Sequence, residues 1–126
     1  MNQMNRKIKQ IIILRKDLTV RRGKMHVQAA HASNGFLQLC ALGKRKLSDV
    51  EYDWITLGNR KICVGVNSEE ELLKIFNLAE QEGIFATLVT DAGMTEFNGR
   101  PTNTAVALGP DLDEKLDKLT GHLTLL

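Results

Sequence analysis

The feature that most constrains the fold of this chain is a short apolar run, rich in β-branched residues, near its N-terminus. Between Ile8 and Leu14 the sequence is IKQIIIL, and β-branched side chains at this density favour a buried strand. A basic segment ending at Gly23 follows, and apolar residues then recur at helical spacing as far as Leu42. A strand that leads into a long amphipathic helix predicts an α/β fold with that helix packed on a sheet.

The alternation of strand-like and helix-like segments continues to the end of the chain and predicts a mixed sheet with helices on both faces. We expect strands at about 8–14, 61–66, 84–90 and 104–108 and helices at about 24–42, 48–54, 68–83 and 111–121. The predicted fold class is therefore a single-domain, three-layer α/β/α fold over residues 1–126, with a mixed sheet of four to five strands. Residues 1–6 are polar, and we expect them to be flexible.

Specific residue types predict three of these boundaries. Ser68, followed three residues later by Glu71, matches the capping box that begins a helix. Asp111 and Glu114 match the same pattern at the start of the last helix. Gly109–Pro110 is expected to end the fourth strand, because Gly-Pro pairs mark turns.

The 126 residues carry a formal net charge of +2, but the charges are distributed unevenly. Residues 1–46 hold eleven Lys or Arg and one acid, whereas residues 47–126 hold six Lys or Arg and fourteen acids. Such a split favours a surface that binds a polyanion, with nucleic acid as the first candidate. The alternative is that the basic and acidic parts pair with one another within the fold or across a dimer.

Composition excludes several classes of protein. The longest uninterrupted apolar run, Ile11 to Leu14, is far shorter than the roughly 18 residues of a membrane span or the roughly 7–15 of a secretory signal. We therefore expect a cytoplasmic protein.

Cys40 and Cys63 are too few and too far apart for a zinc site or a redox pair, and the histidines lack ligand spacing. We expect no metal and no cofactor.

Three polar residues share one side of the first predicted helix. Lys24, Gln28 and His31 lie four and then three residues apart, which at about 100° per residue gives a stripe about 60° wide beside the apolar face. Lys24 stands at the start of this helix, where unpaired N–H groups and the helix dipole favour an anion. Arg21 and Arg22 add positive charge there. A polar stripe by itself is usually a solvated surface, so its position is what marks these residues as candidates.

Asp91 is the second candidate, because it ends the third predicted strand, where α/β proteins bind ligands. Thr95 and Thr104 lie at the two ends of the polar loop that follows. The alternative for Asp91 is a turn-stabilising aspartate whose side chain bonds its own backbone.

Several motifs, taken in order, resemble those of the type 2 peptidyl-tRNA hydrolase family. They are RKDL at 15–18, GKMHVQAAHA at 23–32, NSEEELL at 67–73, DAGMT at 91–95 and GPDLDEKLDKLTGHLTLL at 109–126. The resemblance covers nearly the whole chain, from about Lys7 to Leu126. It implies a compact α/β fold with a mixed sheet between helices, usually as a homodimer. It also implies hydrolysis of the ester bond that joins a peptide to the terminal ribose of tRNA.

The resemblance assigns six positions to the catalytic set. They are Lys24, Gln28, His31, Asp91, Thr95 and Thr104. Thr104 is assigned by its distance to Gly109–Pro110, because the loop is one residue longer than the family pattern, and Thr102 remains an alternative. Met94 stands where the family commonly has arginine, and Glu96, where it has glutamine, adds a negative charge near a phosphate-rich substrate.

We expect direct attack by water, because the set contains no serine or cysteine paired with a base, as a covalent acyl-enzyme would require. Asp91 would orient or deprotonate the water, and the hydroxyl of Thr104 or Thr95 would fix its second hydrogen bond. Lys24 would hold Asp91 ionised and stabilise the oxyanion or the leaving oxygen. His31 or a water network as the base is the alternative. Gln28 and His31 are otherwise expected to bind the terminal nucleotides or to support Lys24.

Five basic residues are expected to contact the phosphates of tRNA, which predicts salt-sensitive binding. They are Arg21, Arg22, Lys44, Arg45 and Lys46. Two other classes of function remain open: a non-catalytic tRNA- or RNA-binding module on the same fold, and a protein–protein adaptor. The module would bind tRNA without cleaving the ester, and the adaptor would bind no RNA.

Overall fold

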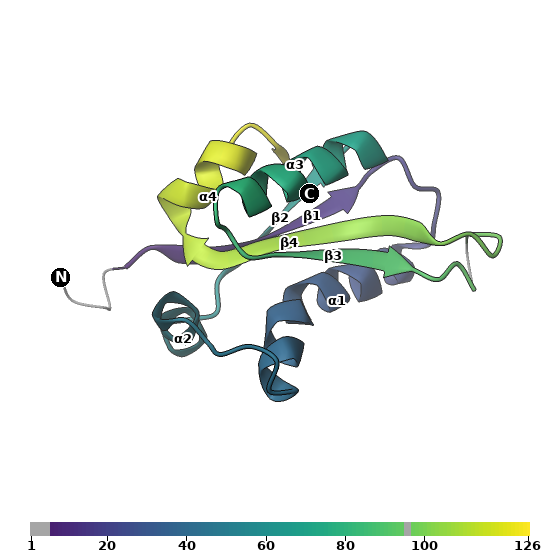
Figure 1. Ribbon diagram of the computed structural model, residues 1–126. Coiled ribbons are helices and arrows are strands. Elements are labelled where there is room, and N and C mark those ends of the chain that lie inside the picture. Colours follow the sequence, from purple (N-terminus) through teal and green to yellow (C-terminus); the bar gives the residue numbers. More distant parts are fainter. Residues whose placement is uncertain (1–5, 95–96) are drawn as a thin grey trace.

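The computed structural model describes residues 6–94 and 97–126, which form one sheet with helices on both faces. The elements are β1 (Ile8–Arg15), α1 (Arg22–Ala41), α2 (Asp49–Thr56), β2 (Lys61–Val66), α3 (Glu69–Gln81), β3 (Ala86–Asp91), β4 (Thr102–Leu112), α4 (Asp113–Thr120) and β5 (Thr124–Leu125). Figure 1 shows α1 and α2 below the sheet and α3 and α4 above it. The predicted three-layer α/β/α class is confirmed. Of residues 1–6, which were expected to be flexible, residues 1–5 lie outside the described residues, and Arg6 pairs with Asp53 at 2.6 Å.

The sheet has the strand order β3-β4-β1-β2-β5 and is mixed. β1 pairs in parallel with β2 and antiparallel with β4, so the β-branched run of the sequence occupies the centre of the sheet. Its residues are buried from Ile8 to Leu14, because helices cover both faces there. α1, which follows β1, packs on one face, and α3, which follows β2, packs on the other.

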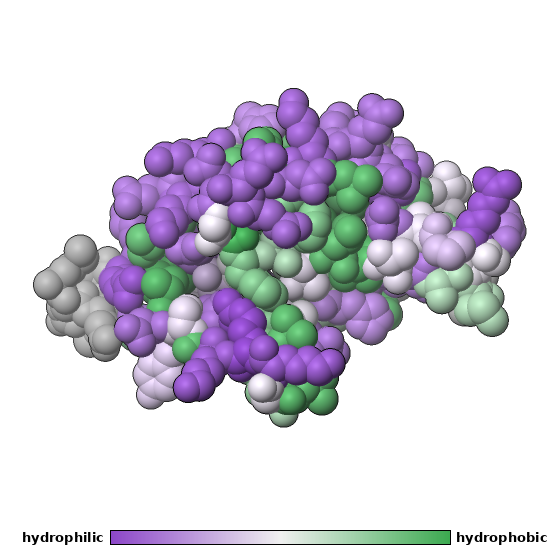
Figure 2. Space-filling view, in the orientation of Figure 1, coloured by the Kyte–Doolittle hydropathy of each residue, from purple (hydrophilic) through white to green (hydrophobic). Residues whose placement is uncertain are grey.

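The surface distribution of polar residues agrees with this layering. Figure 2 shows hydrophilic residues over α3 and α4 and hydrophobic residues between the layers, where β3 forms an edge of the sheet. Within the described residues, no helix is both long and apolar enough to cross a membrane.

The prediction that Gly109–Pro110 ends the fourth strand is wrong, because β4 continues to Leu112. The register between β1 and β4 shifts between Lys9 and Ile11, so that β4 carries one extra residue at this point. Such a bulge accommodates proline within a strand, since the bulged residue need not donate to the ladder. Gly109 has a φ of +83°, which a glycine adopts at no steric cost.

The capping predictions are confirmed at one helix and wrong at another. The Ser68 hydroxyl accepts from the Glu71 N–H at 3.1 Å, as expected, although the Glu71 carboxylate accepts from Asn67 rather than from Ser68. At α4 no side chain caps the helix, because the Asp111 carboxylate accepts instead from the N–H of Leu112. β5, a two-residue strand that pairs with β2, was not among the predicted strands.

Candidate active site

Four polar side chains from three elements meet where α1 begins, β3 ends and β4 begins. Lys24 and Gln28 lie in the first turns of α1, Asp91 is the last residue of β3, and Thr104 lies near the start of β4. Lys24 Nζ is 2.8 Å from Asp91 Oδ2, and Gln28 Nε2 is 3.0 Å from the same oxygen. The Thr104 hydroxyl is 2.7 Å from Gln28 Oε1. We call these four residues the polar cluster. They include four of the six positions that the sequence assigned.

Hydrogen-bond chemistry fixes the direction of each bond in the polar cluster. An ionised carboxylate only accepts, so the Gln28 amide must turn its NH₂ group toward Asp91. Its carbonyl oxygen then faces Thr104, whose hydroxyl must donate to it. The chain of bonds therefore runs from Thr104 through Gln28 to Asp91.

A β-bulge directs the Thr104 side chain toward α1. The pairing of β3 with β4 passes from Val89–Ala105 to Thr90–Asn103, which leaves Thr104 as the extra residue. Ala105 belongs to the apolar cluster that packs against α1, and strict alternation would send Thr104 to the opposite face. Bulges change the direction of a side chain in this way.

The alternative threonine, Thr102, lies outside the polar cluster. Its hydroxyl donates to the backbone carbonyl of Arg100 at 2.9 Å. The geometry thus brings Thr104, and not Thr102, to Gln28 and Asp91. Thr95, the other predicted threonine, lies outside the described residues, as does Glu96.

Burial separates the polar cluster into two pairs. Gln28 is 1% exposed and Thr104 is 0% exposed, whereas the side chains of Lys24 and Asp91 are 16% and 14% exposed. The prediction that Gln28 lies in a stripe beside the core is therefore wrong. A buried amide needs partners for both of its ends, and Asp91 and Thr104 supply them. Only Lys24 and Asp91 have surface that a substrate can contact.

The surroundings of Asp91 favour its ionised form. The hydrogen bond from Lys24 is the main reason that the pKa of Asp91 lies below its usual range, and the N–H of Gly93 lowers it further. The Gly93 N–H lies 2.7 Å from Asp91 Oδ1, so Asp91 also makes the turn-stabilising bond considered as its alternative role. Gly93 has a φ of +82°, and a Cβ there would lie 2.2 Å from the carbonyl oxygen of Arg100. The turn that holds Asp91 therefore requires glycine.

A second set of contacts, which was not predicted from the sequence, holds the strand ends beside the polar cluster. Arg15 binds Asp17 through two nitrogens, at 3.1 and 2.6 Å, and donates a third bond to the carbonyl of Asn103 at 3.0 Å. Asn103 Oδ1 accepts from the hydroxyl of Thr90 at 2.6 Å. Both Thr90 and Asn103 adjoin the bulge at Thr104. Arg15 belongs to the RKDL motif, which was a signal without an assigned role.

His31 and Met94 are not part of the hydrogen-bonded polar cluster. His31 is exposed, and among the described residues it makes no hydrogen bond or ion pair. Met94 is 85% exposed in the loop after β3. Within the described part of the chain, no group of three or more His, Cys, Asp or Glu residues could hold a metal ion.

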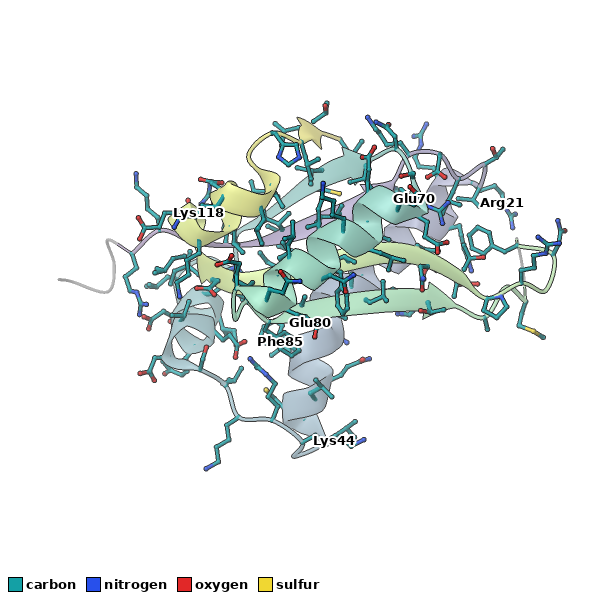
Figure 3. The ribbon with its side chains drawn as sticks, turned by 45° about the horizontal axis from the view of Figure 1, so that its top comes forward. Arg21, Lys44, Glu70, Glu80, Phe85 and Lys118 are labelled. Carbon is teal, nitrogen blue, oxygen red and sulfur yellow. The ribbon has the colours of Figure 1, made fainter. Side chains whose placement is uncertain are left out.

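The predicted phosphate-binding residues fall at opposite ends of α1, which at 20 residues is about 30 Å long. Arg21 and Arg22 lie at its start, beside the polar cluster, and Lys44 and Lys46 follow its end (Figure 3). Arg45 is engaged in the fold, because its guanidinium is 2.7 Å from Glu51 and 4.1 Å from the centre of the Phe85 ring.

Part of the uneven charge of the sequence is neutralised inside the fold. Arg6 pairs with Asp53 and Lys9 pairs with Asp117, each at 2.6 Å, as Arg45 pairs with Glu51. In each pair the base comes from the first 46 residues and the acid from the rest. The alternative explanation for the charge split therefore accounts for some of these residues.

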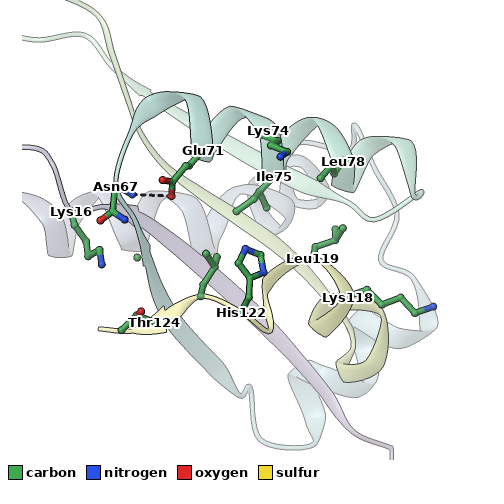
Figure 4. Close-up of a pocket in the computed structure, with 12 residues that line it drawn as sticks. Lys16, Asn67, Glu71, Lys74, Ile75, Leu78, Lys118, Leu119, His122 and Thr124 are labelled. Atoms are coloured by element: carbon green, nitrogen blue, oxygen red, sulfur yellow. Dashed lines mark hydrogen bonds between the residues drawn. The ribbon is translucent and has the colours of Figure 1, made fainter.

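A cavity of about 490 Å³ lies on the opposite face of the sheet, between α3, α4 and the end of β2 (Figure 4). Lys16, Asn67 and His122 are among its lining residues, and Ile75 and Leu119 form apolar walls. It contains no member of the polar cluster. We therefore place the candidate active site at the Lys24–Asp91 pair and not in this cavity, because the residues assigned from the sequence meet at the pair.

The carboxylate, which a buried amide orients, can hold a water, and the accessible ammonium beside it can stabilise a developing negative charge, as the hydrolysis of an ester requires. Residues 8–126 match the family described as peptidyl-tRNA hydrolase PTH2, and the chain belongs to this family.

Curated relatives match over almost their whole length. The chain is 42% identical to the peptidyl-tRNA hydrolase of Methanocaldococcus jannaschii over 119 residues, which are 94% of this chain and 100% of that protein. It is 44% identical to the peptidyl-tRNA hydrolase of Methanothermobacter thermautotrophicus, with the same coverage. A solved structure of a protein of unknown function from Agrobacterium tumefaciens strain C58 has a TM-score of 0.57 and 18% identity. That likeness covers 95% of this chain and 98% of the other, and it concerns the fold alone.

Proposed function

We propose that this chain hydrolyses the ester bond between a peptide, or an N-blocked amino acid, and the 3′ end of tRNA, and so recycles peptidyl-tRNA. The observation that carries the proposal is the accessible pair of Lys24 Nζ and Asp91 Oδ2, 2.8 Å apart, in a member of the PTH2 family. The chain is an enzyme of the ester-hydrolysing class.

In the proposed mechanism, water attacks the ester carbon directly and the bond to the ribose oxygen breaks. Asp91 accepts a hydrogen bond from this water and directs its oxygen at the ester carbon. A carboxylate with a lowered pKa is a weak base, so orienting the water is its main contribution. The Lys24 ammonium stabilises the negative charge that develops on the carbonyl oxygen and then on the leaving oxygen. The water supplies the proton that the ribose oxygen gains and the hydroxyl that the acyl group gains.

Gln28 and Thr104 act as positioning residues in this mechanism. Both are buried, so they contact Asp91 or each other rather than the substrate. Their bonds keep one carboxylate oxygen at Lys24 while Gly93 holds the other. This differs from the expectation that Gln28 binds nucleotides and Thr104 binds the water.

The tRNA would place its 3′ end at the start of α1 and its backbone toward the end of α1. Arg21 and Arg22 come three and two residues before Lys24 and would contact phosphates near the 3′ end, and Lys44 and Lys46 would contact the backbone farther away. We further propose that the chain acts in the cytoplasm, as one domain over residues 1–126, and that it forms a homodimer. Light scattering of the purified protein measures the oligomeric state.

The decisive experiment measures release of the N-acetylated amino acid from N-acetyl-aminoacyl-tRNA by the purified protein. Release by the wild type, and loss of release in the Asp91→Asn variant, is the expected result. Binding of tRNA without any release would instead identify a non-catalytic RNA-binding module, and absence of binding would indicate an adaptor.

A further inference from the structure

One aromatic side chain lies beside the catalytic pair, outside the apolar core. The centre of the Phe97 ring is 6.0 Å from Lys24 Nζ. Phe36, Phe76 and Phe85 belong to the apolar clusters of the core, whereas Phe97 does not. It is half-buried in the loop between β3 and β4. The core therefore gives no reason for an aromatic residue at this position.

Hydrogen bonds connect the placement of Phe97 to Asp91. The N–H of Gly93 binds the Asp91 carboxylate, and the carbonyl of Gly93 accepts from the N–H of Gly99 at 2.8 Å. The N–H of Arg100 donates to the carbonyl of Phe97 at 2.9 Å, which closes a tight turn. Phe97 therefore begins a turn that is fixed to the catalytic carboxylate.

The proposed substrate brings one planar group to this place. The scissile ester is on the ribose of the terminal nucleotide, so the base of that nucleotide lies within a few ångströms of the ester. Aromatic side chains bind unpaired bases by stacking, and all bases offer a π-face. The ring beside Lys24 has the chemistry and the position for such a contact.

We propose that Phe97 is the platform on which the terminal base of tRNA stacks while the ester lies between Lys24 and Asp91. This inference rests on the proposed function and adds to it a subsite for the terminal base. Stacking is present before and during the reaction, so it strengthens binding of substrate and transition state equally. Its loss therefore raises KM and leaves kcat unchanged.

The test compares two N-acetyl-aminoacyl-tRNAs that differ only in whether the terminal ribose carries its base. For the wild type we expect kcat/KM to be roughly 5- to 150-fold higher with the base present. In Phe97→Ala this advantage disappears through KM, and in Phe97→Trp it is retained. Met94→Ala, at an exposed apolar residue of the same loop, is the matched control and keeps the advantage.

Two results would overturn the proposal. One is an unchanged advantage of the base in Phe97→Ala. The other is an equal loss of activity on both substrates in that variant, which would mean that the ring only supports Lys24.

A binding measurement separates this inference from the proposed function. Uncharged tRNA with 2-aminopurine as its terminal base changes fluorescence when the base stacks on an aromatic ring. We expect the change with wild type and with Phe97→Trp but not with Phe97→Ala, at protein concentrations that saturate the tRNA. If the wild type releases no amino acid, the proposed function fails, and the fluorescence still decides whether Phe97 stacks. The same fluorescence in wild type and Phe97→Ala would refute the stacking.

Discussion

Two ion pairs near the two ends of α1 have almost the same nitrogen–oxygen distance but different surroundings. Lys24 is 2.8 Å from Asp91, and Arg45, just past the other end, is 2.7 Å from Glu51. The Glu51 side chain is 2% exposed and also accepts from the N–H of Ser48 in a capping box. Because protein groups already occupy this carboxylate, we interpret the Arg45–Glu51 pair as structural. The Asp91 side chain, in contrast, is 14% exposed and can contact a substrate, so the exposure of the carboxylate separates the two roles.

The largest expected effect is on activity, at the accessible pair. Asp91→Asn and Lys24→Met should each lower kcat by at least about 100-fold, because each removes a charge that acts on the reacting atoms. Both variants should still be folded at the assay temperature, because a single substitution usually costs about 0.5–3 kcal/mol. Release of N-acetylated amino acid and thermal melts of the same preparations measure both effects. Turnover close to wild type in both variants would remove these residues from the mechanism.

The converse is expected at the Arg45–Glu51 pair. Glu51→Ala should lower the free energy of unfolding by about 2 kcal/mol, between the cost of a lost helix cap and that of a broken buried pair. Glu51→Gln, which can still accept from Ser48, should cost less. Urea unfolding measures the difference, and kcat of the folded fraction should stay within a fewfold of wild type. A large loss of kcat in folded Glu51→Gln would contradict the division into two roles.

An intermediate effect is expected at the residues that position Asp91. Thr104→Val leaves the buried carbonyl of Gln28 without its donor, which costs about 1–2 kcal/mol and should lower kcat by roughly tenfold. Thr102→Val, two residues away, removes only an exposed bond to Arg100 and should leave kcat within about twofold. Steady-state kinetics of the two variants compare them directly. Equal effects would show that the bulge does not select Thr104.

The smallest expected effect is on titration. Because Lys24 lowers the pKa of Asp91, the carboxylate should stay ionised to below about pH 4, the usual value for an aspartate. A lowered pKa in the folded state contributes stability above the unfolded pKa, and this contribution is lost as the pH falls through the folded pKa. In Lys24→Met the Asp91 pKa should rise, which NMR titration of the carboxyl carbon measures. An unchanged titration would show that Lys24 is not the main cause of the shift.

The sequence predicts the elements whose signals are local. The apolar run of β1, the helical spacing of α1 and the Ser68 cap of α3 depend on neighbouring residues, and the structure contains all three. Lys24 and Asp91 were also predictable, since the start of a helix and the end of a strand are recognisable from the sequence. The pairing of these two residues is consistent with that prediction.

The features that were missed depend on pairing between distant residues. Gln28 appears polar and exposed by helical spacing, and only the partners that β3 and β4 supply make it buried. The direction of Thr104 and the passage of β4 through Pro110 both follow from register shifts between strands. Helical and strand periodicities carry no information about which residue a neighbouring strand leaves unpaired.

The bulge at Thr104 has a consequence for how this protein can vary. The extra residue turns the hydroxyl toward α1, so deleting one residue of β4 at this point would restore the alternation and change which side chain faces α1. The two ends of the β3–β4 connection thereby act on one carboxylate, since the Gly93 N–H binds Asp91 directly and Thr104 acts on it through Gln28. Both ends of the connection are therefore constrained by the position of Asp91.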